Sequence, residues 1–110
     1  MTETEFQRSV IELAQRTGWK VAHFRPAKTE KGWRTPVAAD GAGFPDLVCL
    51  SGARIVVAEL KLDGKQPPQK QREWLDAWAG TAAEVHVWRP RDWPHIERVF
   101  TGKPAERTPF

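Results

Sequence analysis

Cysteine, tyrosine and long apolar runs are what this sequence has least of. Its 110 residues include one cysteine, Cys49, and no tyrosine. A single thiol cannot form a disulfide within the chain, so we expect a protein of the reducing cytoplasm. No stretch approaches the roughly 20 apolar residues of a membrane-spanning helix, and the charged start MTETEFQRSV lacks the apolar centre of a signal peptide. These absences argue against membrane and secreted classes and favour a small cytoplasmic domain.

Acidic residues are scarce in one segment. The chain has a net charge of +3 and a pI of about 9.4. Between residues 20 and 34 only Glu30 is acidic, whereas the basic residues there are Lys20, Arg25, Lys28, Lys31 and Arg34. Such a segment suits the phosphate backbone of a nucleic acid, and a solvated loop is the alternative interpretation. Trp33 lies among these charges and either stacks on a base or packs within the loop.

Hydrophobic periodicity predicts an α/β fold. The predicted elements are a helix over 3–17, strands over 19–24, 47–50 and 54–60, a helix from 67 to 79, a strand over 84–88 and a short helix over 90–100. Residues 26–43 show little periodicity and are predicted to form a long loop, either functional or disordered. The order αβββαβ with a final helix fits a mixed sheet flanked by helices on both faces. We expect one domain over residues 1–100 and a frayed tail over 101–110.

The residues that carry chemistry fall on the predicted hairpin of strands 47–50 and 54–60. Asp46 precedes its first strand, and Glu59 and Lys61 end its second. Alternate side chains of a strand share a face, so Glu59 and Lys61 are predicted to project together while Leu60 points the other way. With a turn near residues 51–53, the register allows Asp46 to lie beside Glu59.

Two adjacent carboxylates repel each other unless positive charge lies between them, and a divalent cation is the usual solution. Oxygen ligands favour Mg²⁺ or Mn²⁺ over zinc. The histidines are scattered along the chain: His23, His86 and His95. Lys61 would neutralise charge on a phosphate or help to deprotonate a water. A surface Glu–Lys pair with an unrelated aspartate is the simpler interpretation, but Glu59 and Lys61 end the apolar run 55–58, where charge is not expected.

These residues also carry a family resemblance. The Pro-Asp of 45–46 and the Glu-Leu-Lys of 59–61, after a helix bearing glutamate, resemble the half-motifs of the PD-(D/E)XK nuclease superfamily. The Gly-Phe-Pro-Asp turn at 43–46 and a glutamine-rich helix start leading to Trp-Leu-Asp at 74–76 narrow the match. Together they resemble the VRR-NUC family of nucleases, especially its stand-alone members, over residues 3 to about 100. The resemblance implies a restriction-endonuclease-like αβββαβ core.

The resemblance also implies roles for these residues. Asp46 and Glu59 match the family's metal ligands, which bind Mg²⁺ or Mn²⁺, and Lys61 matches its active-site lysine. The family has a further glutamate on its first helix, for which Glu3 and Glu5 compete. Glu3 shares the inward stripe of the helix, whereas Glu5 points toward solvent, so we favour Glu3.

A glutamine on the second helix is the family's other mark, and Gln69 and Gln71 compete for it. Two residues that are two apart on a helix cannot both face one site. Gln71 lies three residues before Trp74, and Gln69 suits a capping position after two prolines. We therefore favour Gln71.

The implied function is Mg²⁺-dependent hydrolysis of DNA phosphodiesters, with a branched substrate such as a Holliday junction, in DNA repair or recombination. The residues expected to contact DNA are Arg25, Lys28, Lys31, Trp33 and Arg34. A homodimer would match the two-fold character of a junction, with apolar residues of the last helix (Trp93, Ile96, Phe100) as its interface. A catalytically inactive DNA-binding module of the same fold and an RNA or nucleotide hydrolase are the alternatives.

Overall fold

The computed structural model describes residues 1–24, 27–29, 32–34 and 38–102, with side chains omitted for 27–29 and 32–34. Three α-helices and six strands are assigned in this part of the chain. In chain order the elements are α1 (Glu3–Arg16), β1 (Lys20–His23), β2 (Ala27–Thr29), β3 (Gly32–Arg34), β4 (Leu47–Ser51), β5 (Arg54–Leu60), α2 (Gln69–Ala79), β6 (Glu84–Trp88), the 3₁₀ turn η1 (Pro90–Asp92) and α3 (Trp93–Thr101).

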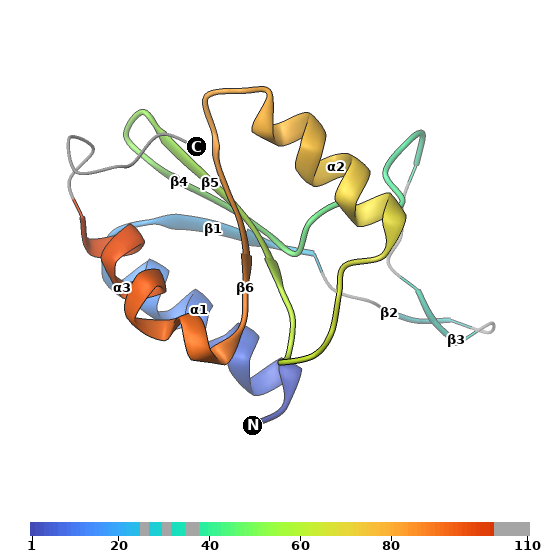
Figure 1. Ribbon diagram of the computed structural model, residues 1–110, viewed down its shortest axis with the longest axis horizontal. Helices are drawn as coiled ribbons and strands as arrows, with labels where there is room; N and C mark the ends of the chain where they lie inside the picture. Colours follow the sequence, from blue (N-terminus) through green and yellow to red (C-terminus); the bar gives the residue numbers. More distant parts are fainter. Residues whose placement is uncertain (25–26, 30–31, 35–37, 103–110) are drawn as a thin grey trace.

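Four strands form a mixed sheet in the order β1-β4-β5-β6. The pairs β1–β4 and β4–β5 are antiparallel, and β5–β6 is parallel. Because parallel neighbours need a crossover connection, α2 links β5 to β6. Figure 1 shows α1 and α3 together on one side of the sheet and α2 on the other. The predicted mixed sheet flanked by helices is confirmed.

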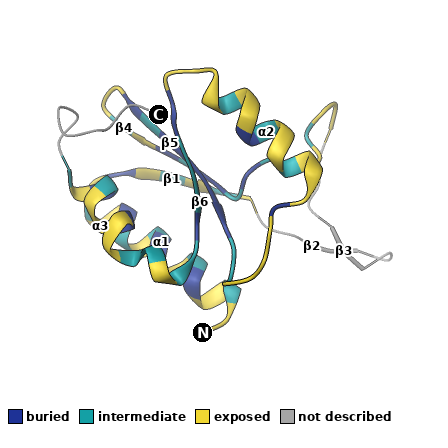
Figure 2. Ribbon diagram, viewed as in Figure 1, coloured by how far each residue is buried: buried dark blue, intermediate teal, exposed yellow. Residues whose placement is uncertain are grey.

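The main core lies between the sheet and the pair α1 and α3. Strand β5 is buried along most of its length, and its alternate residues Val56, Ala58 and Leu60 belong to this core. Helix α1 contributes its stripe of Phe6, Val10 and Ala14. Figure 2 shows the central strands largely buried and the helices exposed on their outer sides. The opposite faces of β4 and β5 are therefore turned toward the α2 side.

Helix α1 begins as the sequence predicts. Thr2 accepts a hydrogen bond from the Glu5 amide, and the Glu5 carboxylate accepts one from the Thr2 amide, both at 3.1 Å. This capping box satisfies amides that the first helical turn leaves unpaired. Gly18 follows the helix with a φ of 94°, a conformation that other residues rarely adopt.

Two predictions about the chain's path need correction. The predicted loop over 26–43 contains a separate two-stranded sheet, in which Lys28 pairs with Trp33 and Ala27 with Arg34. Strands of three residues are too short to give a readable alternation. The prolines also lie just before α2 rather than in its first turn, because Pro68 occupies the N-cap position.

The predicted dimer surface on the last helix is wrong. Ile96 and Phe100 are buried in the main core, and Trp93 is half-buried against it. The Phe100 ring also packs edge-on against Trp19 and Trp88. These side chains are already covered within one chain, so they are not available to a second copy. Among the described residues, no helix is long and apolar enough to cross a membrane.

Candidate active site

Asp46 and Glu59 lie directly opposite each other at the open end of the β4–β5 hairpin. The register pairs Leu47 with Ala58, which places the preceding Asp46 across from Glu59. The Asp46 amide donates to Oε1 of Glu59 at 3.1 Å, and the Leu60 amide donates to Oδ2 of Asp46 at 3.0 Å. Each carboxylate therefore accepts a backbone hydrogen bond from the other strand, which fixes the position of both.

Lys61 joins this pair on the same face of the sheet. Its Nζ lies 3.4 Å from Oε2 of Glu59. Leu60, between them in sequence, is fully buried in the main core on the opposite face, as strand alternation predicts. The Lys61 amide donates to the Trp88 carbonyl at 2.9 Å, extending the β5–β6 pairing past the end of β5. The three predicted residues are thus brought together.

Glu59 is the residue of the group whose negative charge is most disfavoured by its surroundings. Its side chain is 0 % exposed, and that of Lys61 is 16 % exposed. Burial, and then the neighbouring Asp46, raise the pKa of Glu59 to about 8, although Lys61 acts in the opposite direction. Two carboxylates held this close in a desolvated place favour the uptake of a proton or of another positive charge.

A close backbone contact holds α2 against the turn that precedes Asp46. Gly43 has a φ of 84°, and a Cβ there would lie 2.7 Å from the carbonyl carbon of Lys70 and 2.9 Å from the amide nitrogen of Gln71. Only glycine fits this approach without a shift of the backbone. The Gly-Phe-Pro-Asp turn therefore fixes the start of α2 beside the site.

The structure distinguishes Gln69 from Gln71, which the sequence left as alternative candidates for the site. Gln71 is half-buried, and its Oε1 is buried with no hydrogen-bond partner among the described residues. Gln69 is exposed, and its Nε2 donates to Glu73 on the same helix at 3.4 Å. Helix α2 has no side-chain cap, so the capping role expected of Gln69 is wrong. Gln71 is the glutamine that lies inward.

An aromatic cluster supports the same turn. Phe44 packs edge-on against Phe24 and Trp74 with ring centroids 5.0 Å apart, and against Trp78 at 6.3 Å. The Trp74 indole also donates to the Asp40 carbonyl at 3.0 Å. Neither Phe24 nor Phe44 was among the site residues predicted from the sequence, although Phe44 lies in the Gly-Phe-Pro-Asp turn. Phe24 reaches Phe44 through the pairing of β1 with β4, which no local pattern encodes.

Glu3 and Glu5 behave differently from the hairpin carboxylates. Glu5 is exposed and bound in the capping box, as its predicted solvent orientation requires. Glu3 is half-buried in the first turn of α1, on the stripe of Phe6 and Val10. That stripe packs on the face of the sheet opposite to Glu59. Among the described residues, no three His, Cys, Asp or Glu side chains form a cluster that would hold a metal ion, so Glu3 does not join Asp46 and Glu59 here.

The predicted DNA-contacting residues are only partly described. Lys28, Trp33 and Arg34 lie in the β2–β3 hairpin, and the description covers their backbone pairing alone. Arg25 and Lys31 lie outside the described residues. Their expected contacts with a phosphate backbone therefore remain predictions.

The donor atoms of the site suit a hard divalent cation. Oε2 of Glu59 is buried and lies 3.4 Å from the Lys61 ammonium but accepts no hydrogen bond among the described residues, and Oε1 of Gln71 is buried with no hydrogen-bond partner among them. A buried polar atom left unpaired costs about 1–3 kcal/mol, so such atoms commonly mark a place where a ligand binds. Asp46 and Glu59 offer carboxylate oxygens, which Mg²⁺ and Mn²⁺ prefer. These residues fit the metal that the sequence predicts.

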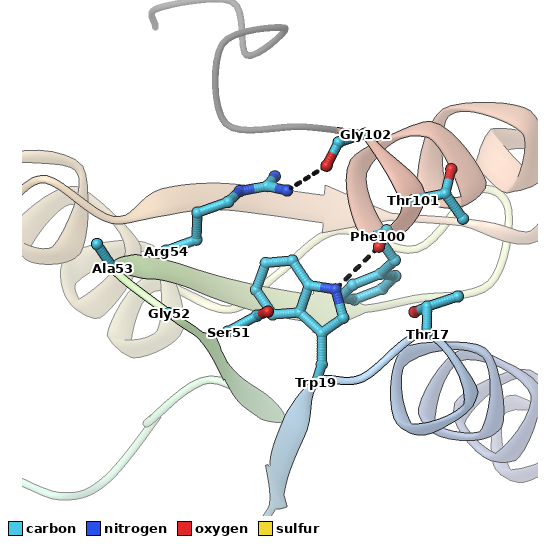
Figure 3. Close-up of a pocket in the computed structure, with 9 residues that line it drawn as sticks. All are labelled: Thr17, Trp19, Ser51, Gly52, Ala53, Arg54, Phe100, Thr101 and Gly102. Atoms are coloured by element: carbon cyan, nitrogen blue, oxygen red, sulfur yellow. Dashed lines mark hydrogen bonds between the residues drawn. The ribbon is translucent and has the colours of Figure 1, made fainter.

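A cavity of about 520 Å³ lies at the other end of the sheet, near the β4–β5 turn. Figure 3 shows the Trp19 indole donating to the Phe100 carbonyl and Arg54 donating to the Gly102 carbonyl. Arg54 also forms two hydrogen bonds with Glu84, at 2.7 and 2.9 Å. The Arg54 guanidinium thus has protein partners on all three nitrogens, which indicates a structural role for this end of the molecule.

No protein-family model and no curated protein matches this chain. The function of this chain is therefore inferred from the residues described above and from the motifs that they form.

Proposed function

We propose that this chain is a metal-dependent endonuclease that hydrolyses the phosphodiester bonds of DNA, with Asp46, Glu59 and Lys61 in its active site. One observation carries the proposal: the buried Glu59 carboxylate is held against a second carboxylate, and its Oε2, which accepts no hydrogen bond among the described residues, has a lysine ammonium 3.4 Å away. A purely structural Glu–Lys pair would not need the second acid. The arrangement supports hydrolysis of an anionic substrate.

Each residue of the site has a distinct part in this proposal. Asp46 and Glu59 would hold Mg²⁺ or Mn²⁺, which when bound supplies Lewis acidity toward a phosphate and a water. The Lys61 side chain is 16 % exposed, and its ammonium would bind a phosphate oxygen and stabilise the charge that grows on it. Gln71 orients its neighbours from α2. The resemblance assigns an assisting role to Glu3, although the structure does not bring this residue to Asp46 and Glu59, and a Glu3→Gln variant measures its contribution.

The proposed substrate is branched DNA, such as a Holliday junction, formed during repair or recombination. Two supports come from the sequence: the resemblance of residues 43–76 to the VRR-NUC motifs, and the basic segment from residue 20 to 34. Basic residues contact phosphates without reading sequence, so this segment would position DNA rather than select a base order.

We further propose that the enzyme acts on a junction as a homodimer, because a symmetric substrate is matched by a two-fold protein. Its interface must lie away from the α3 stripe, which is buried within one chain. Light scattering at micromolar concentration tests this point, and a monomer both alone and on a junction would rule it out.

The deciding experiment is cleavage of an end-labelled four-way junction, beside duplex, flap and single-stranded DNA, in Mg²⁺, Mn²⁺ or EDTA. The variants are Asp46→Ala and Lys61→Met. The matched control is Asp63→Ala, since Asp63 is an exposed acid only two residues beyond Lys61. We expect metal-dependent cutting by the wild type and the control, and a loss of at least about 100-fold in the two site variants.

Two results would contradict the proposal. Equal cutting by the wild type and Asp46→Ala would place the activity elsewhere or in a contaminant. Tight binding of the junction without cutting in either metal would instead identify a DNA-binding module of this fold, and cleavage of RNA alone would redefine the substrate.

A further inference from the structure

Phe24 lies beside the candidate site, directly opposite Asp46 in the sheet. The β1–β4 register pairs His23 with Leu47, so the next pair across the two strands is Phe24 and Asp46. The Phe24 amide donates to the Asp46 carbonyl at 2.9 Å. Directly opposed residues of a sheet project to the same face. Phe24, Asp46 and Glu59 therefore form one row across three neighbouring chain segments, with the aromatic ring next to the first carboxylate.

The Phe24 ring is exposed although it is large and apolar. It is 42 % exposed, and among the described residues the other large apolar side chains so exposed are Met1 and Leu50. One edge of the ring is held by Phe44, with centroids 5.0 Å apart and planes at 74°. Because Phe44 is in turn packed on Trp74, the Phe24 ring is supported on one side and open on the other.

The described residues next to Phe24 on this face of β1 are exposed. Strand β1 is an edge strand, and its alternate residues Lys20 and Ala22 are exposed on the same face as Phe24. Helix α2 packs toward β6, at the opposite edge of the sheet. The β1 side of this face thus presents a basic residue, a small residue and an aromatic ring in succession.

We propose that Phe24 is a stacking platform for an unpaired nucleobase beside the phosphate that is cut. This inference rests on the proposed nuclease function and specifies its substrate as DNA with an unpaired base at the cleavage position. A single exposed ring is too small for a protein interface, which needs several hundred square ångströms per partner. A base, in contrast, offers a flat π-face to one ring, whatever its sequence. The bases of intact duplex are already stacked on one another and do not present this face.

The test compares variants that separate stacking from general packing. Phe24→Ala removes the ring, Phe24→Leu keeps apolar bulk without a π-face, and Phe24→Trp enlarges the π-face. Leu50→Ala is the matched control, since Leu50 is 46 % exposed and shares the same face of the sheet. Circular dichroism and thermal melts show that each variant is folded.

Binding is measured by fluorescence anisotropy with Ca²⁺ in place of Mg²⁺, on a labelled single strand, on a duplex with an unpaired flap and on plain duplex. We expect Phe24→Ala to weaken binding of DNA with unpaired bases by about 5- to 100-fold, and to weaken duplex binding less. Phe24→Leu should show much of this loss, and Phe24→Trp and Leu50→Ala should bind like the wild type. A 2-aminopurine at the unpaired position should be quenched by the wild type more than by Phe24→Ala.

The outcomes distinguish failure of this inference from failure of the proposed function. If the wild type cuts DNA in a metal-dependent manner but Phe24→Ala and Leu50→Ala are equivalent on every substrate, stacking is wrong and the nuclease stands. An equal loss on duplex and on unpaired DNA would also overturn stacking. If the wild type neither binds nor cuts any DNA, both proposals fall together.

Discussion

Asp46 and Glu59 hold each other in place through the backbone: the Asp46 amide donates to Glu59, and the amide that follows Glu59 donates to Asp46. This reciprocal arrangement means that the two acids are fixed before any ligand arrives. It also means that their repulsion is built into the folded state rather than relieved by side-chain rotation. The site is therefore preorganised at a cost in stability.

That cost is testable with Glu59→Gln in EDTA. The folded-state pKa of Glu59 is raised from 4.5 to about 8, so the unfolded chain loses this proton at a lower pH than the folded chain does. The free energy of unfolding should consequently fall as pH rises from 4.5 to 8, by up to about 5 kcal/mol. Glu59→Gln, which cannot ionise, should be more stable than the wild type at pH 8 and similar to it at pH 4.5.

Urea denaturation at both pH values measures this difference, and the variant should have no nuclease activity at either. Mg²⁺ should raise the melting temperature of the wild type but not that of Glu59→Gln, because only the wild type offers the charged ligand. A variant less stable than the wild type at pH 8 would show that Glu59 is not under electrostatic strain.

The glutamines of α2 provide a second prediction. Gln71→Ala should lower cleavage by about 10- to 100-fold, because residues that orient metal ligands typically contribute this much. Gln69→Ala is the control, since Gln69 is exposed on the same helix, and should leave cleavage unchanged. Steady-state cleavage of the junction compares the two, and equal rates would remove Gln71 from the site.

The third prediction concerns the contact between Gly43 and α2. Gly43→Ala should destabilise the protein by about 2–4 kcal/mol, because a positive φ and a clash with the Lys70 backbone both oppose a Cβ. Gly52→Ala is the matched control: its φ is also positive, at 58°, but no atom lies within 4 Å of the added carbon. Gly52→Ala should lower the free energy of unfolding by about 1 kcal/mol.

Chemical denaturation measures the loss of stability in Gly43→Ala and in Gly52→Ala. Cleavage by folded Gly43→Ala should also fall, because a shift of α2 moves Gln71, whereas Gly52→Ala should retain activity. If the two substitutions cost the same, the close approach does not constrain α2.

His86 supplies a prediction on the acid side. It stacks on Trp88 with ring centroids 4.6 Å apart, and burial, reinforced by His95, lowers its pKa from 6.5 to about 4. Between these values the unfolded chain binds a proton that the folded chain excludes. The free energy of unfolding should therefore fall by up to about 3 kcal/mol as pH drops from 6.5 to 4. His86→Phe should lose most of that slope in denaturation series at pH 7, 5.5 and 4.5, and an unchanged slope would assign it to other groups.

Much of the fold and the centre of the site follow from local patterns. Strand alternation and the turn near residues 51–53 suffice to place Asp46 across from Glu59 and to turn Leu60 away from them. The helical wheel predicts that Gln69 and Gln71 cannot face the same side, and in the structure Gln71 is half-buried whereas Gln69 is exposed. These relations connect residues of the same strand, hairpin or helix, so the repeat of that element and the position of its turn are enough to predict them.

Long-range relations could not be predicted in the same way. The stripe of Ile96 and Phe100 looks identical whether its own core or a second copy covers it, and here its own core does. Glu3 lies on the inward stripe of α1, but the wheel cannot tell which face of the sheet that stripe will meet. Phe24 reaches the site only through the pairing of β1 with β4. In each case the sequence pattern shows which side of a helix or strand is apolar, but it does not show which other part of the fold packs against that side.

The short-range character of the site has one more consequence. Asp46, Glu59, Lys61 and Gln71 all belong to a single uninterrupted stretch made of one hairpin, one connection and the start of one helix. The capping box of Thr2 and Glu5 lies outside this stretch, and the ion pair of Arg54 with Glu84 ties the start of β5 to β6. We expect the stretch to keep its geometry when it is grafted into another sheet with the same strand order. The recipient would need to supply a covered far face, a parallel strand that accepts the Lys61 amide as β6 does, and an edge strand carrying the aromatic ring.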